Sequence, residues 1–425
     1  MESYDVSVVG LGFAGVPTAV AAARAGLRVL GLDSSPRRVR DIRNLAPGCG
    51  LTTVSEAALE SVLAGDHLRV RDTSAPMLPA GVHVLCVPTP QGTDGGADLG
   101  PLIAAVDRVA ASLRRGDLVL VQSTCPPGVV RRVVAHRLVN GSGLAVGSGF
   151  RLAYSPVRTD PGSNPAYPRV VAGATPGCLE AARRFLSRLT DQLIPMGSIE
   201  AAELVKVFEN TFRLVNISLV NELAAVCRVS HVDFGEVLDA ASSKPYGFLR
   251  HQPGPGAGGD CIPISAGFFA AAAREHGVAA TVVETAIALN QAMPAYTVHH
   301  VRRVLTANNL PPLRGSRVLV VGVTYKPDVP NTKQAAAVRI LEQLRLEAEV
   351  GYHDPYVPSL LLTDGTALHS KEIERGVADL VLVLTRHRVL DEQRLLGCGA
   401  PVVDCSSGEP RLLCWRGPAS LLSAS

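Results

Sequence analysis

The sequence has few aromatic residues and no large excess of charge of one sign. Phe, Tyr and Trp make up 4% of its 425 residues, and the formal net charge is +3. A low aromatic content with abundant Ala, Val, Leu and Gly favours packed α/β layers over an aromatic-rich β-sandwich. Basic and acidic residues are mixed along the chain, so the sequence does not show the concentrated positive charge that nucleic-acid binding requires. We therefore expect no nucleic-acid partner.

The sequence also lacks long apolar runs and closely paired cysteines. No apolar run has the length of a membrane span, and the N-terminus enters a strand pattern without a signal peptide, so we expect a cytoplasmic protein with no membrane partner. The nine cysteines form no Cys-x-x-Cys pair, which argues against a zinc site and a disulfide framework. We expect no metal. At 425 residues the chain is too long for one ordinary core and should form two or three domains.

A glycine-rich turn follows the first predicted strand. Apolar residues at 4–10 run into the turn at 10–15, and an alanine-rich helix is predicted at 14–25. In the dinucleotide-binding βαβ unit the first glycine makes the turn, the second lets the backbone approach a pyrophosphate, and the helix N-terminus meets the anion. The sequence therefore predicts a dinucleotide site here.

The next predicted strand, 27–32, ends at an acidic residue, Asp33. A carboxylate at this point can accept hydrogen bonds from both ribose hydroxyls and would repel a 2′-phosphate. This favours NAD over NADP, although Arg37 and Arg38 weaken the preference.

Two more predicted strands, 82–87 and 117–122, each lead into a polar loop. Ligands of doubly wound sheets lie beyond the carboxyl ends of the strands, so both loops should face the nicotinamide half of the cofactor. Thr124 is the hydroxyl expected nearest to the chemistry. An ordinary strand-ending turn explains it equally well.

A long amphipathic helix is predicted at 200–229, and a second helical run at 265–307. Lys206 and Asn210 are four residues apart and share a face with Glu203 and Arg213, a pattern that a solvated polar stripe also explains. Polar residues continue, however, into the apolar part at Asn216 and Asn221, and the second run contains Asn290, which indicates a buried polar seam. Long helices between α/β domains commonly form a dimer interface, so we expect a homodimer.

A second strand unit begins after Pro311 and Pro312. The strand from Arg317 is followed by predicted strands near 349–353, 379–385 and 401–404, which complete a second open sheet without a glycine fingerprint. Lys326 is a candidate phosphate contact, and an exposed surface lysine is the alternative.

Residues 252–263 form a loop rich in glycine and proline, with Cys261 near its end. Such a loop lets another molecule approach its backbone, and a thiolate is the strongest side-chain nucleophile near neutral pH. A small apolar residue in a turn is the alternative.

Taken together, these segments resemble the UDP-glucose/GDP-mannose dehydrogenase family over nearly the whole chain and in the family's order. Their PGPGxGGxCIP form is similar to the bacterial UDP-N-acetylhexosamine branch of that family, which forms uronates of N-acetylmannosamine or N-acetylglucosamine. The matching motifs are GLGFAGVPTAV at 10–20, CVPTP at 86–90, STCPPG at 123–128, ELVKVFENTFRLVNISLVNE at 203–222, PGPGAGGDCIP at 253–263, GVTYKP at 322–327 and YHDP at 352–355.

The resemblance implies an α/β fold of two Rossmann-like doubly wound parallel sheets joined by a long central helical segment. Its parts would be an NAD-binding domain at 1–197, a helical dimerisation and active-site domain at 198–310, and a UDP-sugar-binding domain at 311–425. It further implies an NAD-dependent nucleotide-sugar 6-dehydrogenase that oxidises a C6 alcohol to a carboxylate with two NAD in succession, in uronate and polysaccharide biosynthesis.

The resemblance also assigns roles to residues. Cys261 would add to the aldehyde and later carry a thioester, Lys206 and Asn210 would stabilise the anionic oxygen, and Thr124 would position a water or a proton. The NAD site would comprise Gly10, Leu11, Gly12, Phe13, Ala14, Gly15, Asp33, Arg38, Val87, Pro88, Thr89, Ser123, Thr124 and Lys333. The substrate site would comprise Arg158, Lys206, Asn210, Arg250, Gly258, Tyr325 and Lys326.

Several positions depart from the family's pattern. Val157 stands where the family has the glutamate thought to direct the hydrolytic water, and Ser265 stands where it has an aspartate. The remaining departures are Gln122 for a glutamate, Asn331 and Lys333 in place of Asp and Arg, Ala335 for a serine, and Asp260 where relatives often carry histidine.

These departures leave three hypotheses open. The first is a working 6-dehydrogenase in which Asp160 or Asp260 has taken over the lost role, although a carboxylate beside the thiol would disfavour the thiolate. The second is an enzyme that stops at the aldehyde or thioester, or that uses an unusual nucleotide sugar. The third is a homologue that binds both ligands without turnover.

Overall fold

The computed structural model describes residues 3–46, 49, 54–74, 76–92, 95–158, 167–408 and 410–414. Asp160 lies outside these ranges. The chain divides into two compact units: the first unit is Met1–Glu209 with Gly267–Ala279, and the second is Asn210–Ala266 with Ala280–Ser425. Each contains one large sheet, so the predicted α/β fold with two sheets is confirmed. The division into three parts at 197 and 310 stays a prediction.

The sheet of the first unit has eight strands in the order β3-β2-β1-β4-β5-β6-β7-β8. All neighbouring strands are parallel except β6 and β7, which pair antiparallel. The central strands are nearly continuous runs of buried apolar residues, as expected for a parallel sheet covered on both faces. The strands are β1 (Tyr4–Val9), β2 (Val29–Asp33), β3 (Leu68–Asp72), β4 (Ala80–Leu85), β5 (Leu118–Val121), β6 (Arg151–Tyr154), β7 (Arg169–Gly173) and β8 (Leu193–Pro195).

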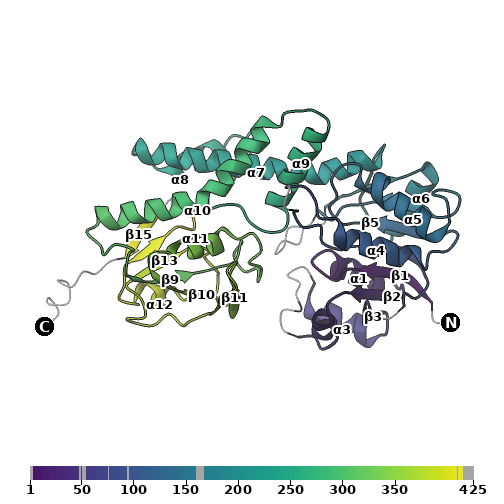
Figure 1. The fold of residues 1–425 in the computed structure, drawn as a ribbon, viewed down its shortest axis with the longest axis horizontal. Helices are drawn as coiled ribbons and strands as arrows, with labels where there is room; N and C mark the ends of the chain where they lie inside the picture. The colour runs from purple at the N-terminus through teal and green to yellow at the C-terminus, as the bar shows by residue number, and fades with distance from the viewer. Residues whose placement is uncertain are drawn as a thin grey trace. The chain divides into compact units, whose positions relative to one another are not determined.

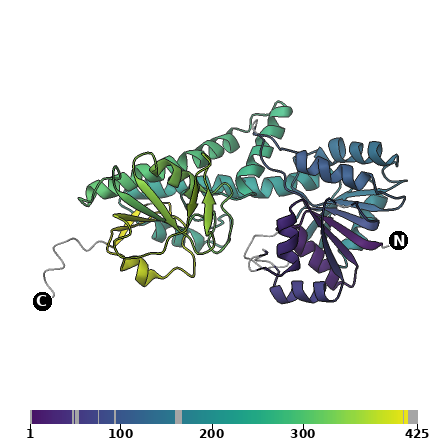
Figure 2. The same cartoon turned by 60° about the horizontal axis from the view of Figure 1, so that its bottom comes forward.

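Helices cover both faces of this sheet (Figure 1, Figure 2). One face packs on α1 (Gly15–Arg24), α2 (Pro36–Arg43), α3 (Glu56–Ala64) and α6 (Pro176–Leu186). The other packs on α4 (Gly100–Ala110), the π-helical turn η1 (Val130–Val134) and α5 (Ala135–Ser142). The carboxyl ends of β1, β2, β4 and β5 are therefore held by a core on each side.

The large sheet of the second unit has the order β10-β9-β13-β14-β15, and a small sheet pairs β11 with β12. One face packs on α10 and α11, and the other on α12. The elements are β9 (Arg317–Val321), α11 (Ala336–Leu344), β10 (Glu349–His353), β11 (Ser359–Leu361), β12 (Ala367–His369), β13 (Leu380–Val383), α12 (Glu392–Leu396), β14 (Val402–Asp404) and β15 (Arg411–Cys414), with α8 (Phe234–Ser242) and α10 (Thr281–Ala307) before them.

Two of the three boundaries between the units fall within two further helices, α7 (Ile199–Val229) and α9 (Ile262–Glu275), and the third, between Ala279 and Ala280, lies just before α10. The predicted helix at 200–229 is confirmed as α7. The prediction of one run over 265–307 is wrong, because α9 ends at Glu275 and α10 begins at Thr281. Gly277 adopts a φ of 70°, and the N–H of Val278 donates to the carbonyl of Ala273. A left-handed glycine with this bond closes a helix C-terminus.

None of the described helices is both long and apolar enough to cross a membrane. Among the same described residues, no three His, Cys, Asp or Glu side chains are placed to hold a metal ion.

Candidate active site

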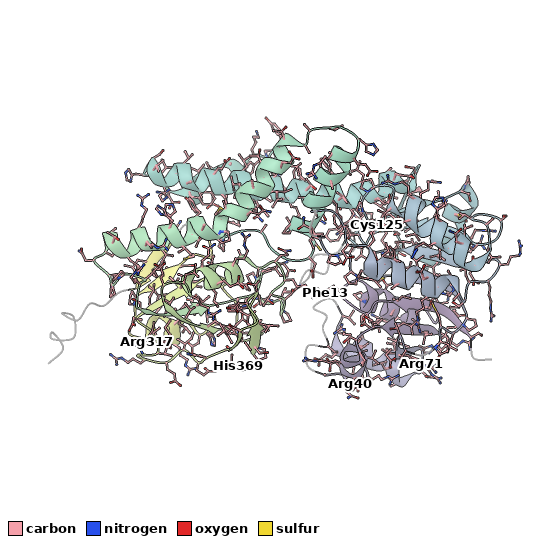
Figure 3. The ribbon with its side chains drawn as sticks, viewed as in Figure 1. Phe13, Arg40, Arg71, Cys125, Arg317 and His369 are labelled. Carbon is pink, nitrogen blue, oxygen red and sulfur yellow. The ribbon has the colours of Figure 1, made fainter. Side chains whose placement is uncertain are left out.

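The glycine turn after β1 is shaped by both its own packing and its open side. A Cβ on Gly10 would lie 2.7 Å from the carbonyl oxygen of Cys86, and one on Gly15 would lie 1.7 Å from the carbonyl oxygen of Gly10. A Cβ on Gly12 would meet no atom within 4 Å. The outer two glycines are thus required by the fold, whereas Gly12 faces open space where a ligand can approach. Phe13, on the same turn, is 37% exposed (Figure 3).

The carboxylate of Asp33 is fixed against this turn at the end of β2. Its two oxygens accept hydrogen bonds from the N–H groups of Leu11 (2.8 Å) and Ser35 (2.9 Å). Each carboxylate oxygen can still accept another bond, such as one from a ribose hydroxyl. Arg38 donates from Nε to the carbonyl of Leu11 at 2.8 Å, and its burial lowers its pKa although Asp33 raises it. Arg38 therefore braces the turn.

Asp33→Ala is expected to weaken NAD binding by about 1–3 kcal/mol, because the lost hydrogen bonds involve a charged acceptor. The variant also frees the Leu11 N–H that shapes the turn. Calorimetric titration with NAD measures the effect, and Asp41→Ala, a change on the neighbouring helix, is the matched control. A tighter dissociation constant for NADP than for NAD in the unchanged protein would contradict the role given to Asp33.

The loops after β4 and β5 are tied together, as their positions in the sheet predict. The hydroxyl of Thr89 donates to the carbonyl of Thr124 at 2.6 Å, and the hydroxyl of Ser123 donates to the carbonyl of Val87 at 2.8 Å. Thr124 itself is half-buried. The structure thus gathers the predicted residues of 87–89 and 123–124 at the edge of the sheet that carries the glycine turn.

Glu203 joins the loop after β5 to α7. Its carboxylate is fully buried and accepts from the N–H groups of Gly128 (2.5 Å) and Val130 (2.9 Å). Burial raises the pKa of Glu203 from 4.5 to about 7, while the two N–H groups lower it. The sequence placed Glu203 on the polar face of this helix but gave no sign of these partners, which lie 73 and 75 residues away.

The raised pKa of Glu203 makes stability depend on pH. Between pH 4.5 and about 7 the folded chain holds a proton on Glu203 that the unfolded chain has lost, so the free energy of unfolding falls as pH rises through this window. The expected fall is on the order of 1–3 kcal/mol.

Urea unfolding of the protein and of Glu203→Gln at pH 5 and pH 7.5 tests this, with Glu200→Gln as the control on the same helix. The side-chain amide in Glu203→Gln has a single acceptor oxygen for the two backbone N–H groups of Gly128 and Val130, so that variant should be less stable at both pH values. It cannot titrate, so it should also lose the pH difference. An unchanged difference would show that another group causes it.

The polar seam predicted on α7 is confirmed by burial. Glu203, Lys206, Asn210 and Asn221 are each less than 8% exposed, whereas Arg213 is exposed, so a solvated stripe does not describe them. In the part of the chain that the structure describes, no ion pair neutralises the ammonium group of Lys206. A buried cation without a counter-ion is costly, and an anionic oxygen would stabilise it.

Cys261 lies immediately before α9 and is exposed, while the other seven cysteines described are all buried. This exposure does not favour the alternative of a small apolar residue in a turn, and the role of Cys261 as a nucleophile stays a prediction. Cys125 shows the contrast: it is fully buried, and burial raises its pKa well above the usual value (Figure 3). A buried neutral thiol is a poor nucleophile.

Ser265 links Cys261 to Asn210 within the second unit. The Ser265 N–H donates to the carbonyl of Cys261 at 3.0 Å, and the amide of Asn210 donates to the Ser265 hydroxyl at 2.9 Å. Ser265 is 1% exposed. Three of the residues named from the resemblance thus form one connected group.

Two asparagines hold the glycine-rich loop before Cys261. Asn290 accepts from the Ala257 N–H at 2.7 Å and donates to the Ala257 carbonyl at 3.0 Å, and Asn221 accepts from the Gly254 N–H at 2.9 Å. A Cβ on Gly258 would lie 2.6 Å from the carbonyl oxygen of Gln334. Only glycine at 258 permits this close approach to the loop that follows β9.

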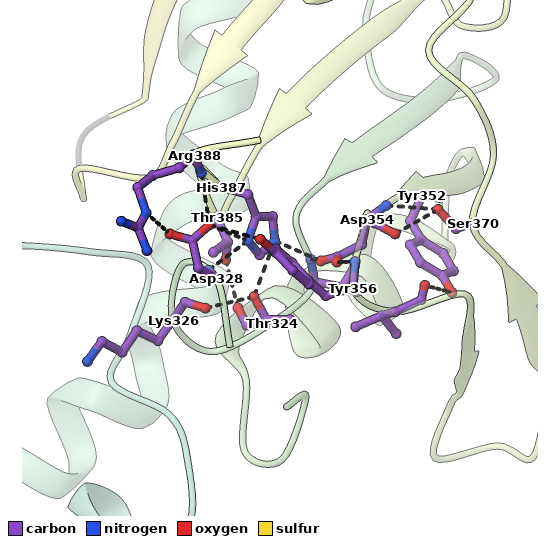
Figure 4. Close-up of polar contacts among 12 residues, drawn as sticks. Thr324, Lys326, Asp328, Tyr352, Asp354, Tyr356, Ser370, Thr385, His387 and Arg388 are labelled. Carbon is purple, nitrogen blue, oxygen red and sulfur yellow. Dashed lines mark hydrogen bonds and ion pairs between the residues drawn. The ribbon is translucent and has the colours of Figure 1, made fainter. Parts of the chain in front are cut away.

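The loop after β9, which carries Tyr325 and Lys326, is anchored by a buried histidine (Figure 4). His387 Nδ1 accepts from the N–H of Asp328 at 2.9 Å, so its proton is assigned to Nε2, which donates to Asp354 Oδ2 at 3.1 Å. Asp354 also accepts from the Val323 N–H at 2.8 Å. Burial raises the pKa of Asp354, but the hydrogen bonds together lower it by more than burial raises it. The pKa of Asp354 therefore lies below its usual value.

Lys326 extends away from this cluster (Figure 4). The Thr324 hydroxyl donates to the Lys326 carbonyl at 3.0 Å, so the loop is fixed on both sides of Tyr325. No sequence pattern points to His387, and Asp354 stands out in the sequence only as part of the YHDP motif. His387 lies 33 and 59 positions from its partners Asp354 and Asp328, beyond any local pattern.

Three other predicted binding residues are paired with carboxylates of their own unit. Arg158 Nε lies 3.1 Å from Glu209, and its NH1 donates to the Pro168 carbonyl. Arg250 lies 2.6 Å from Asp239, and Lys333 lies 3.5 Å from Asp260. Their roles in substrate or cofactor binding stay predictions.

Comparison with known proteins identifies three matching domains. The UDP-glucose/GDP-mannose dehydrogenase family's NAD binding domain matches residues 4–184, its central domain matches 200–292, and its UDP binding domain matches 319–407. The NAD-binding match contains the glycine turn and Asp33, and the UDP-binding match contains the anchored loop after β9.

Individual relatives match over most of their length. The chain is 30% identical to a UDP-N-acetyl-D-mannosamine dehydrogenase of Pyrococcus horikoshii, with 90% of this chain and 89% of the relative covered. It is 31% identical to a UDP-N-acetyl-D-glucosamine 6-dehydrogenase of Pseudomonas aeruginosa, with 84% of each covered. A solved UDP-N-acetyl-D-mannosamine dehydrogenase structure from Pyrococcus horikoshii superposes with a TM-score of 0.84 at 26% identity, covering 98% of this chain and 97% of that one.

These matches confirm the predicted cofactor, NAD, and the predicted class of enzyme, an NAD-dependent oxidoreductase. The residues of the glycine turn fit the cofactor, because Gly12 leaves its side of the turn open and Asp33 keeps acceptor positions for a ribose. The chain belongs to the UDP-glucose/GDP-mannose dehydrogenase family.

Proposed function

We propose that the chain oxidises the C6 alcohol of a UDP-N-acetylhexosamine toward the uronate, with Cys261 as the nucleophile. The names of the relatives support the substrate class. The observation that carries the chemistry is the exposed thiol of Cys261 at the end of a glycine loop, whose backbone carbonyl accepts from Ser265, which in turn accepts from Asn210. A structural cysteine would be buried, as the other described cysteines are.

NAD, when bound, accepts one hydride in each of two oxidations. In the first, the C6 alcohol loses a hydride from carbon and a proton from oxygen and becomes an aldehyde. Lys206 and Asn210 stabilise the alkoxide oxygen while it carries negative charge, a role in which fixed donors act without reorganisation.

The Cys261 thiolate then adds to the aldehyde carbon, and the oxygen takes up a proton to give a thiohemiacetal. Loss of a second hydride and the hydroxyl proton leaves a thioester on Cys261. Water attacks the thioester carbonyl and gives up one proton to solvent, the C–S bond breaks with Cys261 leaving as the thiolate, and the acid product loses its second proton to become the carboxylate. Each step conserves atoms and charge with two hydrides removed per sugar.

The lack of an acid at Val157 supports the second hypothesis, an enzyme that stops short of the carboxylate. Val157 is half-buried, and its side chain can neither orient nor deprotonate a water. The third hypothesis, binding without turnover, has less support because Cys261, Lys206 and Asn210 are all retained.

NADH formation with a panel of nucleotide sugars tests the proposal. The panel should contain UDP-N-acetylmannosamine, UDP-N-acetylglucosamine, UDP-glucose and GDP-mannose. We expect NADH with at least one UDP-N-acetylhexosamine, and product mass separates aldehyde from carboxylate. A preference for UDP-glucose or GDP-mannose would contradict the proposed substrate class.

We also propose that the chain is a homodimer formed through α7. Its exposed apolar side chains form a stripe along one side of the helix, opposite the buried polar seam. A contiguous stripe of exposed apolar side chains on a protein surface commonly marks an interface with another protein. The stripe comprises Leu204, Phe208, Phe212, Leu219 and Val226, each at least 41% exposed.

Light scattering at micromolar concentration is expected to give the mass of a dimer. Leu219→Glu with Val226→Glu should shift the protein to monomer, because two charges would be buried in the interface. Arg213→Glu, on the other side of the helix, is the control and should stay dimeric. A monomeric mass for the unchanged protein would refute the proposal. The cytoplasmic location and the role in polysaccharide biosynthesis stay predictions.

A further inference from the structure

The loop that ends in Cys261 is fastened to the loop after β9 by backbone contacts. The N–H of Gly259 donates to the carbonyl of Lys333 at 3.0 Å. A Cβ on Gly259, whose φ is 84°, would lie 2.9 Å from the ring of Tyr325. Both loops lie in the second unit. A movement of the 325–335 loop must therefore move the backbone beside Cys261.

A polar pair adds to this fastening at the residue that directly precedes the thiol. Asp260 Oδ2 lies 3.5 Å from the ammonium of Lys333 and accepts from the amide of Asn331 at 3.4 Å. Asn331 in turn accepts from the Lys333 N–H through its Oδ1 at 2.9 Å. Asn331 thus contacts both members of the pair and fixes their positions relative to each other.

The pair thus brings two opposite charges together at the residue that precedes Cys261 in the chain. The carboxylate disfavours a neighbouring thiolate, and the ammonium favours it. The other titratable groups on the 325–335 loop are Tyr325, Lys326 and Asp328, and Asp328 is paired with Arg388 at 2.6 Å. As long as Asp260 and Lys333 are paired, their effects on the thiol largely cancel.

We propose that Asp260 is a positioning residue whose pairing with Lys333 sets the reactivity of Cys261 and links it to a nucleoside diphosphate bound by the 325–335 loop. The link to the nucleotide rests on the proposed function, whereas the effect of the charge pair does not. Phosphates near this loop would attract Lys333 away from Asp260 and leave the carboxylate uncompensated beside the thiol. The thiol would then stay protonated to a higher pH.

The test measures alkylation of Cys261 by iodoacetamide in the full-length protein from pH 6 to pH 9, read from the Cys261 peptide by mass spectrometry. The variants are Asp260→Asn, Lys333→Met and the two combined, with Lys371→Met as a control at an exposed lysine of the same unit. Thermal unfolding followed by circular dichroism checks that each variant is folded.

At pH 7 we expect Asp260→Asn to raise the alkylation rate about 2–5-fold and Lys333→Met to lower it by a similar factor, as expected for one charge close to the thiol in a partly exposed site. The double variant should return to within about twofold of the unchanged protein. A role in loop structure alone would move both single variants in the same direction. If the alkylation rate changed in the same direction in both single variants, or in neither, the proposed effect of the charge pair on Cys261 would be overturned.

The second arm repeats the pH profiles with saturating UDP. The midpoint of the profile should rise in the unchanged protein and move less in Lys333→Met, whereas simple shielding would lower the rate equally at every pH. An equal rise in both would overturn the link through Lys333. If calorimetry finds no UDP binding at all, the link and the proposed function fail together, while the result of the charge-pair arm still stands.

Discussion

Cys261→Ala is expected to stop oxidation at the aldehyde. Without the thiol no thiohemiacetal forms. The second hydride can then leave only from the hydrate of the aldehyde, because the aldehyde itself has no tetrahedral C6. The rate of the second oxidation should fall by at least about 10³-fold, in line with the removal of a catalytic nucleophile. Stopped-flow absorbance of NADH, with the enzyme in excess over the sugar, measures both oxidations separately.

The first oxidation and NAD binding should be little changed in this variant, because the glycine turn and Asp33 lie in the first unit and Cys261 lies in the second. Cys261→Ser is the conservative companion and should retain more of the second oxidation than alanine. Two NADH per sugar at an unchanged rate in Cys261→Ala would show that the reaction does not pass through this thiol.

Release of the thioester is the step we expect to be slow in the unchanged protein. A positioned general base contributes about 10²–10⁴-fold to such a step, and Val157 cannot supply one. Ser265 is hydrogen-bonded to Asn210 and can hold no negative charge. An adduct on Cys261 should therefore accumulate during turnover, or a product short of the carboxylate should appear. Intact-protein mass spectrometry detects the adduct.

Val157→Glu is expected to restore the base and shorten the life of the adduct by about 10–10³-fold, less than the full contribution because the site was not selected for this residue. Thr190→Glu, at a half-buried position, serves as the control for adding a carboxylate, because the fully buried Ala153 could not accept one. Complete conversion without an adduct, unaffected by Val157→Glu, would show that another group has taken over.

The structure weakens one of the two replacements considered for that base. One of the two carboxylate oxygens of Asp260, Oδ2, is engaged by Lys333 at 3.5 Å and by Asn331 at 3.4 Å, which leaves only the other oxygen to act on a water. Asp160 lies outside the described residues, so its candidacy stays a prediction.

The parts of the site that follow from local sequence were predicted. The turn at 10–15 and Asp33 are fixed by one strand–helix–strand unit, whose spacing is short enough to leave a direct pattern. Lys206 and Asn210 followed from helical periodicity, which places residues four apart on one face. Cys261 was found because glycines surround it, and its exposure was the property the sequence could not give.

The parts of the site built from residues far apart in the sequence could not be predicted, because such separations leave no local pattern. Glu203 bonds to Gly128 and Val130, and His387 bonds to Asp354, over separations that leave no periodic signal. The break between α9 and α10 was missed because alanine-rich sequence on both sides hid one glycine at 277, where a positive φ ends the helix.

The number of NADH molecules formed per sugar in a single turnover tests the proposed two-step oxidation most directly. Enzyme in excess is mixed with NAD and UDP-N-acetylmannosamine or UDP-N-acetylglucosamine, and NADH is counted by its absorbance. We expect two NADH for one of these sugars even if the thioester is released slowly, because both oxidations precede hydrolysis. No NADH from either sugar, although calorimetry shows that NAD and the sugar both bind, would contradict the proposed oxidation.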